Sequence, residues 1–170
     1  MDLALLIVRV VIGLGFAAHG AQKLFGWFGG YGLAGTGGFF ESIGFRPGQL
    51  FAAAAGFNEF AGGLLIALGL FGPIGPMFVI AVMTTAILSV HISKGFFITN
   101  GGYELNLAYI GLAILFALGG YGAYSLDSAL GLGGIWTPAL AWGIVILGFL
   151  GGLANMAARR KVPQNQPAAN

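Results

Sequence analysis

Five long apolar segments follow one another along the chain. They run from about Leu3 to Leu24, Gly48 to Leu70, Pro73 to Ser93, Tyr103 to Tyr121 and Pro138 to Ala157. Each is close to the ~20 residues that a helix needs to cross ~30 Å of hydrocarbon. The segments are continuously apolar and do not alternate with polar positions, which argues against membrane-spanning strands. The pattern therefore predicts an all-α membrane protein with five transmembrane helices.

Turn-forming residues separate these segments. Pro47 stands before the second segment, a Gly-Pro pair separates the second from the third, and Thr137 with Pro138 begins the fifth as N-cap and first-turn proline. The first segment lacks the basic start of a signal peptide and carries Arg9 inside its apolar run. We therefore expect it to remain as an uncleaved membrane helix.

The composition supports this interpretation and removes several function classes. Hydrophobic residues make up 58% of the chain and charged residues only 7%, with a mean hydropathy of +0.91. The absence of cysteine excludes disulfides and thiolate metal sites. A formal net charge of +2 is too small for a nucleic-acid surface, so no nucleic-acid partner is expected. The 32 glycines lie largely within apolar runs, where small residues let helices pack closely in lipid.

The basic residues in the links, at the segment ends and in the C-terminal tail predict the orientation in the membrane. In a protein with five spans they all fall on one side, and the positive-inside rule then places the N-terminus outside and the C-terminus in the cytoplasm. These residues are Lys23, Arg46, Lys94, Arg159, Arg160 and Lys161. The chain after Lys161 is polar, and we expect it to be disordered.

The link between the first two segments is too long and too apolar for a simple turn. Over residues 26–46 it contains a glycine-rich stretch with aromatic residues, then Thr36, Phe39, Phe40 and Gly44. We expect a short interfacial helix there, capped by Thr36 and ended by Gly44. Residues 125–130 predict a second short helix on the opposite membrane face.

Ionisable residues inside the apolar segments indicate a functional site, because a charge in hydrocarbon is costly. At 100° per residue, the first segment places its polar and aromatic residues on one face, which should point into the bundle. The members of this stripe are Arg9, Phe16, His19 and Lys23. The alternative is that His19 and Lys23 only mark the membrane boundary.

Glu59 is the acidic residue deepest within the second segment. Counted from the segment ends, Arg9 and Glu59 lie at similar depths in two antiparallel helices, so we predict an intramembrane ion pair between Arg9 and Glu59. This pair could fix the helix register, or it could take part directly in proton or redox chemistry.

Several titratable residues are predicted to meet at the basic side of the membrane. His19, Lys23, His91, Lys94 and Glu104 all reach that face at one level, among many aromatic residues. A membrane-interface belt explains some of these aromatics, and the helix dipole explains an acidic residue at the start of a helix. The same set also suits a quinone head, whose carbonyls need donors and whose reduction needs protons.

We therefore assign provisional roles to these residues. His19, Lys23, His91 and Glu104 are the candidate catalytic residues, which handle protons or bind the carbonyl groups. The candidate cofactor-binding residues are Trp27, Phe28, Phe39, Phe40, Lys94 and Phe96. No motif predicts a metal site, and no flavin or dinucleotide fingerprint occurs, so electrons would come from a redox protein partner.

Three stretches of the chain carry a family resemblance. The first joins Arg9 to residues 16–25 and the glycine-rich stretch as far as Phe40; the second covers residues 59–65 and 68–70; the third runs from His91 to Glu104. Residues 125–127 fit the same pattern. Over about residues 3–130, the chain resembles the DoxX family of small bacterial membrane proteins.

The resemblance implies a four-helix transmembrane bundle over residues 1–130 in the bacterial inner membrane. It leaves residues 131–158 as an additional transmembrane helix and residues 159–170 as a basic, then disordered, cytoplasmic tail. Family members are tied to redox work, as relatives of thiosulfate:quinone oxidoreductase subunits, as quinone- or catechol-responsive oxidoreductases, or as partners of superoxide-detoxifying complexes. The resemblance thus favours a quinone-interacting oxidoreductase component.

Other functions stay open at this point. The protein could be a non-catalytic anchor or assembly subunit for a redox partner, or a small transporter. His19 and His91 could also be the axial ligands of a haem. Glycine-rich helix faces make a homodimer conceivable.

Overall fold

The computed structural model describes residues 1–160, which are helical with short connections and contain no strand. The α-helices are α1 (Asp2–Phe25), α2 (Gly32–Ser42), α3 (Gly48–Leu68), α4 (Ile74–Ala86), α5 (Glu104–Gly119), α6 (Leu126–Ala129) and α7 (Pro138–Ala157). A π-helical turn (Ile87–His91) and a 3-10 turn (Ile92–Lys94) extend α4. Further 3-10 turns cover Trp27–Gly29, Ile98–Asn100 and Leu132–Ile135. Lys161 and residues 162–170, predicted as part of the tail, lie outside the described residues.

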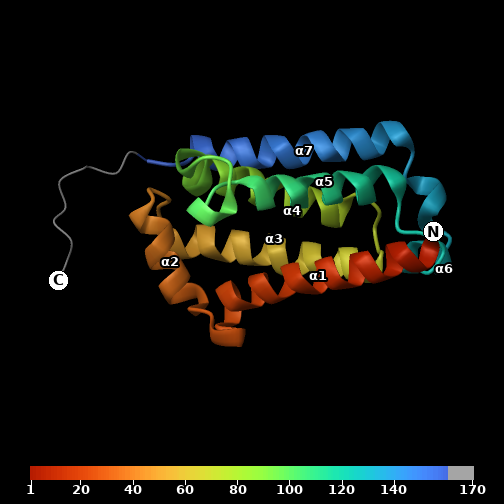
Figure 1. The fold of residues 1–170 in the computed structure, drawn as a ribbon, viewed down its shortest axis with the longest axis horizontal. Helices are drawn as coiled ribbons and strands as arrows, with labels where there is room; N and C mark the ends of the chain where they lie inside the picture. Colours follow the sequence, from red (N-terminus) through yellow and green to blue (C-terminus); the bar gives the residue numbers. More distant parts are fainter. Residues whose placement is uncertain (161–170) are drawn as a thin grey trace.

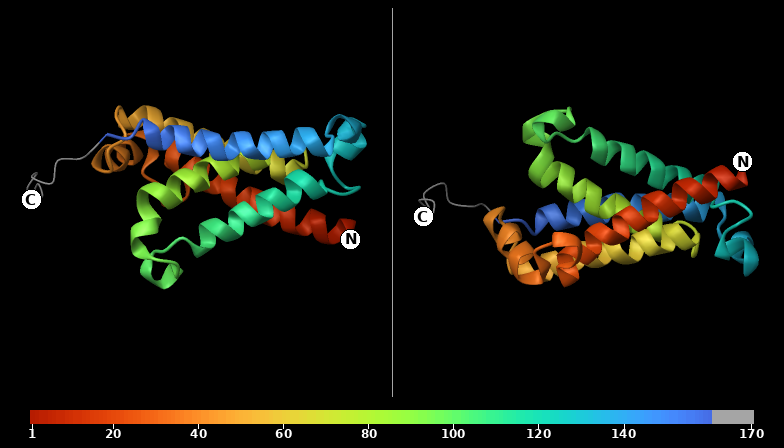
Figure 2. Two further views of the ribbon diagram at one scale, coloured as in Figure 1. Left: turned by 90° about the horizontal axis from the view of Figure 1, so that it is seen from above. Right: turned by 60° about the horizontal axis from the view of Figure 1, so that its bottom comes forward.

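Helices α1, α3, α4, α5 and α7 run lengthwise through one bundle, with α2 across one end and α6 at the other (Figure 1). We call the α2 end the basic end, because it carries Lys23, Arg46, Lys94, Arg159 and Arg160. Seen from above, α5 diverges from α7 toward the basic end (Figure 2).

Four helical stretches are long and apolar enough to cross a membrane: residues 2–25, 48–68, 74–94 and 138–157. The prediction of an all-α membrane protein is therefore confirmed. Helix α5 has 16 residues and so measures about 24 Å, which is short of the ~30 Å hydrocarbon core. The fifth crossing, over this segment, stays a prediction.

Glycines bring α1 and α3 into backbone contact. A Cβ added at Gly13 would lie 2.5 Å from the carbonyl oxygen of Gly63, and one added at Gly20 would lie 2.6 Å from that of Gly56. The glycines recur every seven residues on both helices, so both contacts fall on one seam. This seam fixes the register of α1 against α3.

Helix α7 packs on α4 through a second pair of glycines. A Cβ at Gly148 would lie 2.9 Å from the carbonyl oxygen of Met77, and one at Gly152 would lie 2.6 Å from the Cβ of Thr84. These glycines are four residues apart, which is the spacing of the small-residue motif that lets membrane helices approach closely.

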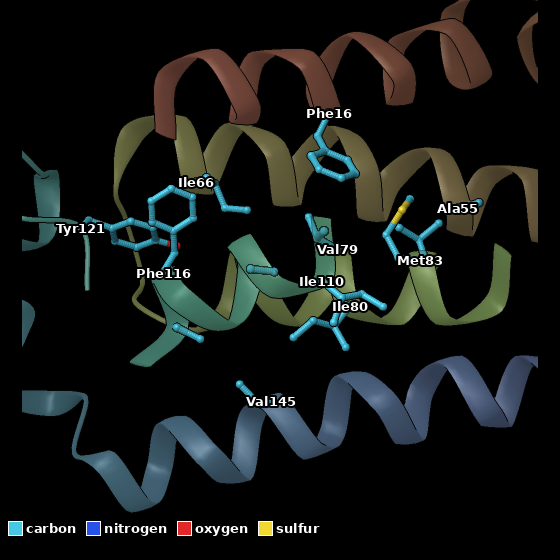
Figure 3. Close-up of a cluster of buried hydrophobic side chains, with 13 residues drawn as sticks. Phe16, Ala55, Ile66, Val79, Ile80, Met83, Ile110, Phe116, Tyr121 and Val145 are labelled. Atoms are coloured by element: carbon cyan, nitrogen blue, oxygen red, sulfur yellow. The ribbon is translucent and has the colours of Figure 1, made fainter. Parts of the chain in front are cut away.

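The apolar core lies between these two seams (Figure 3). Phe16 of α1, Ile66 of α3, Val79 of α4 and Phe116 of α5 are buried together, with Val145 contributed by α7. The core therefore joins all five lengthwise helices, including α7, the helix expected to be additional to the bundle.

The predicted ion pair between Arg9 and Glu59 is wrong. The Arg9 guanidinium donates to the carbonyl oxygen of Ala67 and, at 2.5 Å, to that of Tyr124, whereas Glu59 pairs with Lys23. The glycine seam explains the difference, because it sets Arg9 beside the C-terminal end of α3 and Glu59 beside the last turns of α1. The prediction counted depths from the ends of the apolar segments, and such a count does not reveal the register of α1 against α3.

Asp127 in α6 lies at the end of the bundle opposite the basic end, where it binds the turn between α3 and α4. Its carboxylate accepts hydrogen bonds from the backbone N–H groups of Phe71 (2.7 Å) and Gly72 (2.6 Å), and from the indole of Trp136 (3.1 Å). The Tyr121 hydroxyl donates to the Gly72 carbonyl at 2.8 Å. The predicted short helix over residues 125–130 is thus confirmed as α6, which holds the α3–α4 turn in place.

The short helix predicted between the first two apolar segments is present as α2, but its boundaries differ, and its position at the membrane interface stays a prediction. It begins at Gly32, four residues before the expected cap, so Thr36 lies inside the helix and is buried. It ends at Ser42, followed by Gly44 with a positive φ of 97°. Buried Phe45, after the helix, packs on Phe40 and Phe51 and so draws α2 onto the start of α3.

Candidate functional site

An ion pair between Lys23 and Glu59 forms the centre of the candidate site. Lys23 lies in the last turn of α1, and Glu59 lies in the middle of α3 with only 4% of its surface exposed. A carboxylate at this depth needs a charged or hydrogen-bonding partner, because an isolated charge in an apolar interior is costly. Lys23 supplies that partner from the basic end.

His91 lies beside this pair, at the end of the π-helical turn that follows α4. Its Nδ1 is 2.7 Å from the carbonyl oxygen of Gly101, which can only accept, so Nδ1 is the donor. In the neutral ring, Nε2 is then a free acceptor. His19 is arranged in the same way, with Nδ1 3.2 Å from the side-chain oxygen of Gln22.

A cavity of about 380 Å³ opens next to the ion pair, between α2, α3, α4 and the last turns of α7. This volume falls within the range of small-molecule sites. Its lining residues are Lys23, Thr36, Phe39, Phe40, Ile43, Phe51, Ala54, Ala55, Asn58, Glu59, Val82, Met83, Thr85, Ala86, Ser89, Val90, His91, Asn106 and Asn155. We call it the first cavity.

The first cavity is apolar along most of its wall and polar in two places. Phe39 and Phe40 from α2 and Phe51 from α3 supply aromatic surface, while Lys23 and Glu59 supply the charged side. Ala54 and Phe39 are exposed, so they form the rim on the surface of the bundle. Such a cavity suits a flat apolar molecule with a few polar atoms.

Helix α7 supports the cavity wall made by α2. The Arg159 Nε donates to the carbonyl oxygen of Ile43 at 2.6 Å, and the Arg160 backbone N–H donates to that of Gly44 at 2.8 Å. The Arg159 guanidinium also lies 6.0 Å from the centre of the Phe45 ring, a cation–π distance. These contacts join the C-terminal end of α7 to the end of α2.

A polar contact also joins α7 to α4 within the wall. The Asn155 amide donates to the Thr85 hydroxyl at 3.3 Å, and that hydroxyl lies 3.0 Å from the Ala81 carbonyl and 3.3 Å from the Gly152 carbonyl. The second polar place in the first cavity is therefore formed by α4 and α7 together.

The structure brings together part of the predicted site. Lys23 and His91 line the first cavity with Phe39 and Phe40, and His19 lies in an adjoining cavity that Lys23 and His91 also line. The other predicted residues lie outside the three cavities described for residues 1–160: Trp27, Phe28, Lys94, Phe96 and Glu104.

Position explains why these five lie apart. Trp27 and Phe28 are exposed in the turn before α2, and Phe96 packs on Phe97 and Tyr103 in the loop before α5. Glu104 occupies the first turn of α5, where a carboxylate complements the helix dipole. Residues at one depth in the membrane can still point to different sides of the bundle.

Two amides on α5 and α7 are among the polar residues of the site that were not predicted. Buried Asn106 in α5 donates to the sulfur of Met83 at 3.3 Å and lines the cavity beside the ion pair, and Asn155 closes the far side. Both are amides within apolar segments, which was a usable signal, because polar groups in membrane helices usually face the bundle interior.

The donor set also limits which groups the site could hold. Within residues 1–160, no three His, Asp or Glu side chains come together in a way that could hold a metal ion. The groups around the first cavity instead include an ammonium, a carboxylate, an imidazole and three amides, and these can donate hydrogen bonds or protons to carbonyl oxygens.

Comparison with known proteins places the chain in one family. The DoxX family model matches residues 4–92, which span α1 to the end of the π-helical turn and include Lys23, Glu59 and His91. No curated protein and no solved structure matches the chain. Since the match covers more than half of its residues, the chain belongs to the DoxX family.

Proposed function

We propose that this protein is a quinone-binding membrane component of a redox system, with the quinone head in the first cavity. The observation that carries the proposal is the meeting of Lys23, Glu59 and His91 on one side of a largely apolar cavity of about 380 Å³. Membership of a family of membrane proteins often linked to redox systems supports it.

The side chains fit the chemistry of a quinone. The Lys23 ammonium donates to a carbonyl oxygen and stabilises negative charge there, and Glu59 holds that ammonium in place. The free Nε2 of His91 accepts or delivers a proton at the same side of the cavity. Phe39 and Phe40 offer apolar surface for a flat ring.

The remaining parts of the proposal concern electrons and orientation. A quinone supplies a two-electron, two-proton redox couple, and the electrons come from a protein partner. The basic end faces the cytoplasm of a bacterium, with the N-terminus outside the inner membrane, as the positive-inside rule requires. An exposed rim at Ala54 and Phe39 lets the tail of a lipid-soluble quinone leave the cavity toward lipid.

Binding of a benzoquinone with a decyl tail, measured with the protein in lipid nanodiscs, tests the proposal. Ala54→Phe adds a ring at the rim of the first cavity and should weaken binding at least tenfold. Ala108→Phe is the matched control, because Ala108 is also an exposed alanine on a helix but lies outside the cavities described. Equal affinity of both variants, or no binding to the unchanged protein, contradicts the proposal.

A further inference from the structure

A second cavity of about 190 Å³ lies on the other side of the ion pair. It is bounded by α1, by α5 and by the loop that ends at Gly102. Its lining residues are Phe16, His19, Lys23, Glu59, Met83, His91, Ile98, Gly101, Gly102, Leu105, Asn106 and Tyr109.

The two cavities share a wall. Lys23, Glu59, Met83, His91 and Asn106 line both, so the ion pair is reached from two sides. The first cavity borders α2 and α7, whereas the second borders α1, α5 and the loop before α5. The shared residues therefore separate two spaces with different surroundings.

The second cavity is suited to water. Its polar groups include the two imidazoles, the Tyr109 side chain and the Gly101 backbone, in addition to the ion pair. A buried water needs two to four such partners and roughly 10–15 Å³, so the space is large enough for several. The titratable groups that face the pair are His19 on α1, His91 after α4 and Tyr109 on α5.

The mouth of the second cavity lies at the basic end. Three of its lining residues are exposed: His19 in the later turns of α1, Ile98 in the loop between α4 and α5, and Leu105 in the first turn of α5. In this loop the chain leaves helical structure at Gly95, just after the last residue of the third long apolar stretch. The second cavity thus reaches the surface where the bundle meets the membrane boundary.

We infer that the second cavity is an aqueous antechamber, through which water reaches the Lys23–Glu59 pair from the basic end while the first cavity holds the apolar ligand. Water reaches the pair whether or not a ligand occupies the first cavity, but a role for this water in quinone reduction rests on the proposed function. Reduction of a quinone to a quinol takes two electrons, which come from the proposed redox protein partner, and two protons. The protons come from the aqueous phase at the basic end and reach the first cavity through this water, Lys23, Glu59 and the histidines.

Cysteine labelling tests the antechamber without any quinone, because the native chain has no cysteine. Met83→Cys places a thiol on the shared wall, and methanethiosulfonate ethylammonium, a small water-soluble cation, is the probe. Leu105→Trp obstructs the mouth of the second cavity. Leu107→Trp is the matched control, since Leu107 lies two residues further along α5 with 45% exposure against 41% for Leu105, and outside the cavities described.

In nanodiscs, Met83→Cys should react with the probe, and adding Leu105→Trp should slow the reaction at least tenfold, whereas adding Leu107→Trp should not. Asn106→Cys repeats the test if Met83→Cys does not assemble, and Ile98→Cys, at the mouth, confirms that the reagent is active. The inference is overturned if Ile98→Cys reacts with the probe but neither Met83→Cys nor Asn106→Cys does. The inference is also overturned if Ala54→Phe slows the labelling of the wall cysteine and Leu105→Trp does not. The probe would then reach the pair through the first cavity.

The two proposals fail separately. If Leu105→Trp slows the labelling but the unchanged protein binds no quinone, the proposed function is wrong and the antechamber inference still holds. Quinone binding that Ala54→Phe weakens, together with unreactive wall cysteines, would overturn only the antechamber. Leu105→Trp should leave quinone affinity unchanged, because Leu105 does not line the first cavity.

Discussion

The ion pair between Lys23 and Glu59 predicts an asymmetric response to mutation. Lys23→Met removes the positive charge that pairs with a Glu59 side chain of 6% exposure. Glu59→Gln leaves a Lys23 side chain that is 27% exposed and partly hydrated. An uncompensated buried charge costs more than a partly hydrated one. Lys23→Met should therefore destabilise the protein more than Glu59→Gln.

The magnitudes follow from the exposure of each partner. Removing one partner of a fully buried pair costs about 3–5 kcal/mol, and the partial exposure of Lys23 reduces this to about 2–4 kcal/mol for Lys23→Met. For Glu59→Gln we expect about 1–2 kcal/mol, because the amide keeps an acceptor for the ammonium. Replacing both residues by methionine should cost less than Lys23→Met alone, since no charge remains buried.

Unfolding of purified protein in mixed micelles with increasing dodecyl sulfate, followed by circular dichroism, measures these differences. The pair Arg9 and Glu59 is the control cycle, because Arg9 bonds to backbone carbonyls and not to Glu59. Its coupling energy should be close to zero. Equal costs for Lys23→Met and Glu59→Gln, or strong coupling between Arg9 and Glu59, would refute this reasoning.

Three further substitutions test the packing of the bundle and of the cavity wall. Gly152→Ala places a methyl group 2.6 Å from the Thr84 Cβ and should lower the free energy of unfolding by about 1–3 kcal/mol, whereas Gly151→Ala, with its nearest neighbour at 3.6 Å, should change it little. Asp127→Asn removes the charge of the carboxylate that accepts hydrogen bonds from two backbone N–H groups and from the Trp136 indole. It should lower the free energy of unfolding by about 1–3 kcal/mol and shift the tryptophan fluorescence. Arg159→Met should weaken decyl-benzoquinone binding several-fold by freeing α2, whereas Arg160→Met should not, because Arg160 bonds through its backbone.

The sequence predicts the elements of this fold better than their pairing. Continuous apolar runs define α1, α3, α4 and α7 within a few residues, because hydrocarbon demands both length and apolarity. The partner of Glu59 could not be found in this way. It depends on the register of the glycine seam between α1 and α3, which sets Arg9 beside Ala67. The charge that reaches Glu59 is therefore Lys23, about four helical turns further along α1.

The site residues divide in the same way into those that the sequence predicts and those that depend on how the helices pack. Lys23 and His91 could be found because charged and imidazole groups stand out in apolar segments, and their common depth could be counted. Glu104 and Lys94 have the same depth but face elsewhere, since side-chain direction depends on how α5 and the preceding loop turn against α1. Asn106 shows the converse case, a residue of ordinary type made important by its position on the shared wall.

The first cavity is formed partly by residues inside the family match and partly by residues that follow it. The family match ends at residue 92 and so contains Lys23, Glu59 and His91, the charged and titratable side of the cavity. Asn106 on α5 and Asn155 on α7 complete the wall from outside the matched region, and the end of α7 also holds α2 in place. The matched helices therefore supply the charged and titratable side of the first cavity, while α5 and α7 complete its wall. Selectivity between ligands of one chemical class should accordingly change with residues of α5 and α7, and the ability to bind that class should depend on Lys23 and Glu59.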